Sequence, residues 1–66
     1  MLCEVSIILQ NLLANCYEET SAVMICNQAC SHYINEVMNS TCLDDVYAVP
    51  NFEGIWKAFV NLCESH

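Results

Sequence analysis

Apolar residues recur at steps of three and four positions in three parts of the chain. In the first part they are Leu2, Val5, Leu9, Leu12, Leu13 and Cys16. This spacing places the side chains on one face of an α-helix, so it predicts a helix over residues 2–15. The polar residues 17–21 follow and predict a break, in which Thr20 or Ser21 caps the next helix.

Two further helices are predicted by the same periodicity. The second covers residues 21–38, and its apolar face comprises Val23, Cys26, Cys30, Tyr33, Ile34, Val37 and Met38. The third covers residues 51–64 with Asn51 as its cap, and its apolar stripe comprises Phe52, Ile55, Trp56, Phe59, Val60 and Cys63. Residues 42–50 are too apolar for a free loop, so we expect them to cover the core as a lid.

The cysteine count decides the class of fold. Six cysteines in 66 residues are typical of a secreted scaffold with three disulfides. We therefore predict one all-α domain, residues 1–66, that is a small disulfide-rich bundle of three main helices. A zinc site is disfavoured because Cys26 and Cys30 are the one close cysteine pair. No metal and no cofactor are expected, and the predicted location is extracellular.

Helix geometry limits how the cysteines pair. Cys26 and Cys30 lie four residues apart on one helical face, where they are poorly placed to bond to each other. Cys3 and Cys16 are separated by about 20 Å if both are helical, at ~1.5 Å per residue. In an antiparallel bundle Cys3 and Cys42 share one end, which favours that pair. The geometry leaves Cys26 and Cys30 to be shared between Cys16 and Cys63 in either order.

Charge and composition exclude several functions. The net charge is −7, and Lys57 is the only lysine or arginine. Binding to nucleic acid or to an anionic membrane is therefore not expected, and no apolar run reaches the ~18 residues of a transmembrane segment. An enzyme is not expected either, because His32 is the one internal histidine and a thiol nucleophile requires a free cysteine.

Two surface features are also predicted. The triplet Asn39-Ser40-Thr41 is an N-glycosylation sequence, so Asn39 is expected in a surface turn. An apolar fraction of 56% exceeds what a three-helix core hides easily. We therefore predict an apolar pocket between the second and third helices, under residues 43–50, with the alternative that these side chains are simply core. Its predicted ligand-binding residues are Met24, Tyr33, Ile34, Val37, Met38, Tyr47, Trp56 and Phe59.

The C-terminal part of the chain resembles the elicitins, small secreted three-disulfide helical proteins of oomycetes. The resemblance lies in Met24-Ile25-Cys26-Asn27-Gln28-Ala29-Cys30, in Ile34 and Val37, in Cys42-Leu43-Asp44, and in Phe59 four residues before Cys63. It implies the pairs Cys3–Cys42, Cys16–Cys30 and Cys26–Cys63. The spans Cys3–Cys16 and Cys16–Cys26 are shorter than in elicitins, so much of the sterol cavity does not carry over.

A second resemblance is to the ciliate pheromones, which are acidic three-helix proteins with six cysteines. It lies in Cys3-Glu4 and in the three residues between Cys26 and Cys30. This resemblance implies a different pairing, namely Cys3–Cys30, Cys16–Cys63 and Cys26–Cys42.

Two hypotheses for function follow. In the first, the chain is an elicitin-like secreted protein that binds a sterol or fatty acid and is perceived by a host. In the second, it is a secreted signalling protein, pheromone or effector that contacts a cell-surface receptor and has no ligand cavity. A homodimer is a further expected assembly. The hypotheses differ in whether an internal apolar cavity exists.

Overall fold

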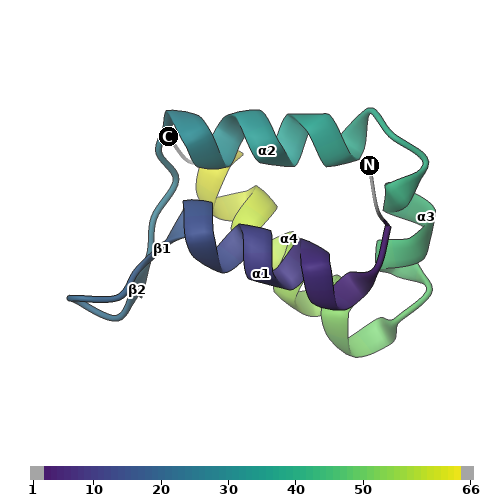
Figure 1. Ribbon diagram of the computed structural model, residues 1–66, viewed down its shortest axis with the longest axis horizontal. Helices are drawn as coiled ribbons and strands as arrows, with labels where there is room; N and C mark the ends of the chain where they lie inside the picture. Colours follow the sequence, from purple (N-terminus) through teal and green to yellow (C-terminus); the bar gives the residue numbers. More distant parts are fainter. Residues whose placement is uncertain (1–2, 65–66) are drawn as a thin grey trace.

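Four α-helices and one short hairpin make up the fold. The computed structural model describes residues 3–64, in the order α1 (Val5–Cys16), β1 (Tyr17–Glu18), β2 (Val23–Met24), α2 (Gln28–Met38), α3 (Cys42–Tyr47) and α4 (Pro50–Glu64). In Figure 1, α2 runs across the top, α1 lies below it, and α4 passes behind α1. Helix α3, on the right, connects α2 to α4. The predicted class, a small all-α disulfide-rich fold, is confirmed.

Each helix contributes one buried stripe to a single core. The stripes recur at steps of three and four residues, which is the spacing of one helical face. They are Ile8, Leu12 and Cys16 from α1, Cys30, Ile34 and Val37 from α2, Cys42 and Val46 from α3, and Phe52, Trp56 and Phe59 from α4. Figure 1 shows how the four helices are arranged.

The first helix is present, but its buried face differs from the predicted one. Ile8 is fully buried, whereas Leu13, expected on the apolar stripe, is 44% exposed. The buried residues of α1 recur every four positions from Ile8, so the buried face is rotated by part of a turn relative to the predicted face. The helix begins at Val5, and the predicted start at residue 2 lies outside the described residues.

The second helix begins at Gln28, so the predicted start at residue 21 is wrong. Strands β1 and β2 instead form an antiparallel hairpin, in which Tyr17 is paired with Met24 and Glu18 with Val23. The backbone N–H of Ile25 then donates to the carbonyl of Cys16 at 2.9 Å. This pairing keeps the chain extended up to Cys26, and β-branched Val23 and Ile25 suit extended backbone.

Asn27 determines where α2 begins. Its side-chain oxygen accepts a hydrogen bond from the backbone N–H of Cys30 at 2.8 Å, the arrangement of an N-cap. Cys26 therefore precedes the helix, so the prediction that it shares a helical face with Cys30 is wrong.

The connection between α2 and α4 is also more ordered than predicted. Residues Cys42–Tyr47 form α3, and Val46 from this helix is buried in the core. The predicted lid is therefore confirmed only in part. Val46 is buried in the core, whereas Tyr47 and Val49 are exposed. Helix α4 begins at Pro50, one residue before the predicted cap, and proline is well suited to a first helical position.

Three disulfides join the elements: Cys3–Cys42, Cys16–Cys30 and Cys26–Cys63. The first is the pair that helix geometry favoured. The other two divide Cys26 and Cys30 between Cys63 and Cys16, one of the two orders left open. This set is the pairing implied by the elicitin resemblance and not the one implied by the pheromone resemblance.

Candidate functional site

A pocket of about 190 Å³ lies between α2 and α4. We call it the α2–α4 groove. From α2 it is lined by residues spaced as one helical face, and from α4 by residues of the last turns. These are Ser31, Ile34, Asn35 and Met38, with Val60, Cys63 and Glu64. The groove is partly open to solvent: Ile34 is buried, Val60 and Cys63 are half-buried, and Asn35, Met38 and Glu64 are exposed at its rim.

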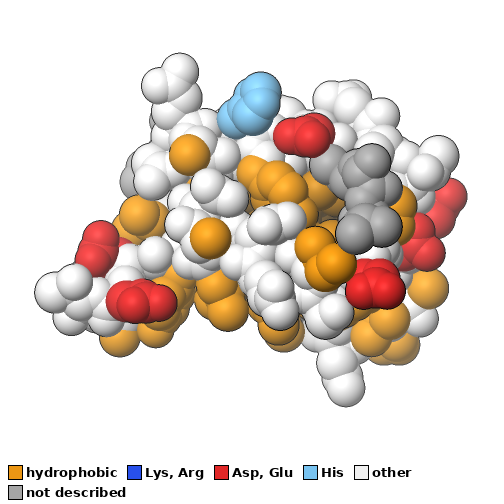
Figure 2. Space-filling model, viewed as in Figure 1, with side chains coloured by type: hydrophobic (Ala, Val, Ile, Leu, Met, Phe, Trp, Pro, Cys, Tyr) orange, Lys and Arg blue, Asp and Glu red, His pale blue; other side chains and the backbone are white. Residues whose placement is uncertain are grey.

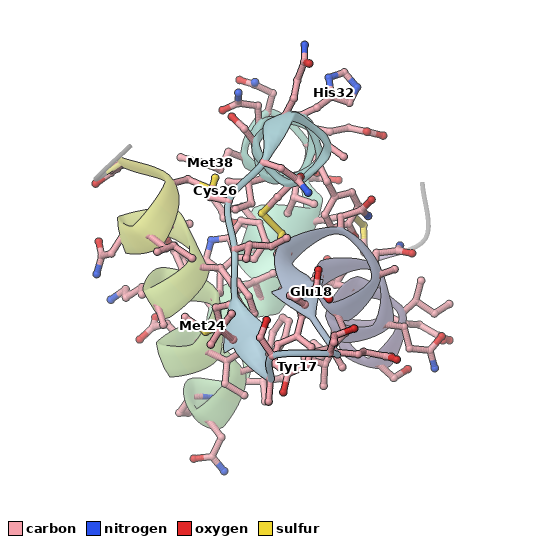
Figure 3. The ribbon with its side chains drawn as sticks, turned by 90° about the vertical axis from the view of Figure 1, so that its left-hand side faces the viewer. Tyr17, Glu18, Met24, Cys26, His32 and Met38 are labelled. Carbon is pink, nitrogen blue, oxygen red and sulfur yellow. A yellow bond between two sulfur atoms is a disulfide. The ribbon has the colours of Figure 1, made fainter. Side chains whose placement is uncertain are left out.

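A disulfide and the orientation of α2 position the side chains of the groove. The Cys26–Cys63 disulfide ties the segment before α2 to the last turn of α4, which holds the two helices together at that end of the groove. In Figure 3, Met38 and Cys26 lie on the side of α2 that faces α4, whereas His32 points away from it. His32 therefore does not belong to the groove.

The size of the groove limits what it can hold. A cavity of about 150 Å³ accommodates benzene, whereas pockets for drug-sized ligands measure roughly 300–1,000 Å³. At about 190 Å³, the groove matches one protein side chain. It is far smaller than a sterol.

The structure does not bring the eight predicted ligand-binding residues to one place. Ile34 and Met38 line the groove. Val37, Trp56 and Phe59 are buried in the core, and Trp56 is only 1% exposed.

The other three predicted ligand-binding residues lie on different parts of the molecule. Tyr33 is turned toward α1, because its hydroxyl accepts a hydrogen bond from Asn11 Nδ2 at 3.3 Å. Met24 is exposed on the hairpin, as Figure 3 shows, and Tyr47 is exposed at the end of α3. These three residues do not line the α2–α4 groove.

Several groove residues were not predicted from the sequence. Val60 and Cys63 belong to the predicted apolar stripe of the third helix, and that stripe was the available signal. Ser31, Asn35 and Glu64 are polar, so a search for an apolar wall passed over them. Ser31 and Asn35 lie four residues apart, as do Val60 and Glu64, which places each pair on one helical face.

The charge of the groove is negative. Glu64 lies at its rim. Lys57, the only lysine or arginine of the chain, is directed elsewhere: its Nζ lies 3.6 Å from Glu53 Oε1 and 5.8 Å from the centre of the Tyr47 ring. Lys57 therefore does not neutralise the carboxylate of Glu64.

Two disulfides lie next to each other at the groove, which Cys63 lines. The Sγ atoms of Cys26, Cys30 and Cys63 lie within 4.8 Å of one another, and those of Cys30 and Cys63 are 3.8 Å apart. Three thiolates this close would suit a soft metal ion. Each of these sulfurs is bonded in a disulfide instead, so none is available as a thiolate ligand.

Large apolar side chains are also exposed outside the groove. They are at least 40% exposed and comprise Leu13, Val23, Met24, Tyr47, Val49 and Ile55. Figure 2 shows apolar side chains along the lower edge of this face, including the underside of the projecting hairpin, which also carries acidic groups. The molecule thus presents apolar surface beside negative charge.

The predicted glycosylation residue lies in the turn between α2 and α3. Asn39 is exposed, and its Nδ2 donates to the carbonyl of Asn35 at 2.9 Å. Ser40 Oγ donates to the carbonyl of Val37 and accepts from the backbone N–H of Cys42. Thr41 is exposed too. The triplet is accessible, and its modification stays a prediction.

Comparisons with models of known protein families, with curated proteins and with solved structures find no match to this chain. Within residues 3–64, no helix combines the length and the apolar character needed to cross a membrane.

Proposed function

We propose that this protein is a secreted signalling protein, a pheromone or an effector, that acts by direct contact with a cell-surface receptor. The observation that carries the proposal is the contrast between buried aromatic side chains and an apolar exterior. Trp56 and Phe59, two of the aromatic residues predicted to line a ligand cavity, are packed in the core, while seven large apolar side chains within residues 3–64 are exposed. Exposed apolar groups with a polar surround are typical of protein contact sites.

The net charge supports a particular kind of receptor. With eight acidic residues and one lysine, the protein attracts a basic surface and repels an acidic one. Two copies of the chain repel each other for the same reason. A basic receptor surface is therefore favoured over a homodimer.

A second candidate is the elicitin-like function, binding of a sterol or fatty acid. The disulfide pairing supports it, because it is the pairing that the elicitin resemblance implies. The groove also lies between the two helices where a ligand site was predicted. Its volume of about 190 Å³ is below the roughly 300 Å³ at which ligand pockets usually begin. The receptor function is therefore favoured.

The test is saturable binding of the labelled, oxidised protein to intact cells. Met38 and Met24 make a matched pair, because they are 44% and 41% exposed and only Met38 lines the groove. We compare Met38→Glu and Met24→Glu, each checked for an unchanged thermal unfolding midpoint. A loss of affinity of at least about tenfold, roughly 1.4 kcal/mol, in either variant supports binding through apolar surface.

Two results contradict the proposal. One is binding to cells that never saturates and is not displaced by unlabelled protein. The other is unchanged affinity in both variants and in the Met24→Glu/Met38→Glu double variant. Which single variant loses affinity identifies the contact surface, the groove or the hairpin.

A further inference from the structure

We infer that the α2–α4 groove binds an arginine side chain of the partner protein. The inference rests on the proposed receptor function and names the group that the groove recognises. The groove is lined by the apolar side chains of Ile34, Met38 and Val60 and by one acidic residue, Glu64. A ligand that complements both is apolar along its length and positively charged at its end.

An arginine side chain fits the groove in size and in chemistry. Arginine has an aliphatic stem that packs along apolar surface and a charged head that stays near water. Its atoms are similar in number to those of benzene, which a cavity of about 150 Å³ accommodates. The groove, at about 190 Å³, holds one such side chain.

The rim fits the guanidinium. This group is planar and has five N–H donors in a fixed arrangement, which suits a carboxylate and further acceptors at once. The rim offers the Glu64 carboxylate, the Ser31 hydroxyl and the Asn35 side-chain amide. Lysine has one compact ammonium group, so it uses this set of acceptors less well.

Among residues 3–64, the one lysine does not compensate the charge of Glu64. The last turn of α4 contributes about half a negative charge, and the start of α2 near Ser31 contributes about half a positive one, so the two helix ends largely cancel. Lys57 precedes Glu64 by seven residues, about 10 Å along a helix, and is paired with Glu53. The carboxylate of Glu64 therefore determines the charge of the rim.

Residues 1–66 of a second copy do not supply the arginine. They contain none, and they carry a net charge of −7. We therefore assign the arginine to a different protein. Arginine is also enriched in protein interfaces while lysine is depleted.

The first experiment tests the groove in isolation. The oxidised full-length protein, labelled with ¹³C in its methyl groups, is titrated with N-propylguanidinium chloride and followed by NMR. We expect saturable shifts of the Ile34, Met38 and Val60 methyl resonances. Butyrate and n-butanol are the anionic and neutral controls for the aliphatic stem, and they are expected to bind at least about fivefold more weakly, roughly 1 kcal/mol.

Two variants test the role of charge. Glu64→Gln removes the rim carboxylate, and Glu36→Gln makes the same change at an exposed α2 residue that does not line the groove. We expect Glu64→Gln to raise the Kd of N-propylguanidinium about fivefold and Glu36→Gln to leave it unchanged. The inference is overturned if no groove methyl shifts, if butanol binds as well, or if both variants behave alike.

The same variants separate this inference from the proposed function. In the cell-binding assay, Glu64→Gln is expected to lose affinity about fivefold while Glu36→Gln binds normally. If Glu64→Gln and Met38→Glu bind cells normally and Met24→Glu does not, the receptor function stands and the arginine site is refuted. If no variant and no wild-type protein binds cells, the proposed function fails, and the NMR titration still tests the groove.

Discussion

Two apolar regions of the molecule include helix α4 and differ in their exposure to solvent. The aromatic core, formed by Phe52, Trp56 and Phe59 of α4, is buried against the other helices, and Trp56 is 1% exposed. The α2–α4 groove is lined by residues of the last turns of α4, Val60, Cys63 and Glu64, and is partly open to solvent. An excess of apolar residues in a sequence therefore does not itself predict a ligand cavity, because part of it fills the core and part remains on the surface.

The sharpest test of this contrast is truncation of the aromatic core. Trp56→Ala leaves a large cavity at a fully packed site, and we expect it to lower the free energy of unfolding by about 3–5 kcal/mol. The measurement is denaturant unfolding followed by circular dichroism.

Ile55→Ala is the matched control for Trp56→Ala. Ile55 neighbours Trp56 on α4 but is 42% exposed, and we expect a loss of less than about 0.5 kcal/mol. Equal losses in the two variants would show that Trp56 is not part of a packed core.

The next largest effect concerns the disulfide at the groove. The Cys26→Ser/Cys63→Ser variant removes a disulfide between residues that are 37 positions apart. From the entropy of loop closure we expect the free energy of unfolding to fall by about 4 kcal/mol. The variant should also abolish N-propylguanidinium binding, because the disulfide ties α4 to the start of α2. The measurements are denaturant unfolding and the NMR titration.

The control is Cys3→Ser/Cys42→Ser, which opens a loop of 39 residues and does not touch the groove. It should lose a similar stability and keep the binding of N-propylguanidinium. Binding that survives the loss of Cys26–Cys63 would contradict the role given to that disulfide.

A smaller effect is expected at the start of α2, which supports both regions. Asn27→Ala removes the side-chain oxygen that accepts a hydrogen bond from the backbone N–H of Cys30. We therefore expect a loss of about 1 kcal/mol in the free energy of unfolding. If the helix instead began near residue 21, Asn27 would lie inside it, and alanine would stabilise the protein because alanine has the higher helix propensity. The sign of the change therefore separates the two helix boundaries.

The smallest effect on stability is expected in the groove itself. Met38→Ala changes a side chain that is 44% exposed, so we expect a change in unfolding free energy within about 0.5 kcal/mol. The same variant should weaken the binding of N-propylguanidinium, because Met38 lines the groove. A large loss of stability would place Met38 in the core and contradict the distinction between the two regions.

Much of the architecture could be predicted from the pattern of apolar residues. The periodicity around Trp56 and Phe59 identified α4 and its core-facing stripe, and the positions of Cys3 and Cys42 at one end of an antiparallel bundle favoured their pairing. These predictions depend on local periodicity and on the fixed rise of a helix.

The rest depends on contacts that the local sequence does not contain. Val23 and Cys26 are spaced as on a helix, yet the segment is extended because Ile25 hydrogen-bonds to the end of α1. The groove depends on how α2 and α4 are placed relative to each other, and its polar members Ser31, Asn35 and Glu64 fit no apolar pattern. Asn27 was a usable signal for the start of α2, because asparagine is a preferred N-cap residue.

The central claim is that Trp56 and Phe59 are packed in the core and that the groove takes one side chain. The most direct test is titration of the oxidised protein with a fluorescent sterol and with a fluorescent fatty acid. We predict no saturable binding of either probe at one molecule per protein. Saturable one-to-one binding that Met38→Glu abolishes without loss of the fold would contradict the account and favour the elicitin-like function.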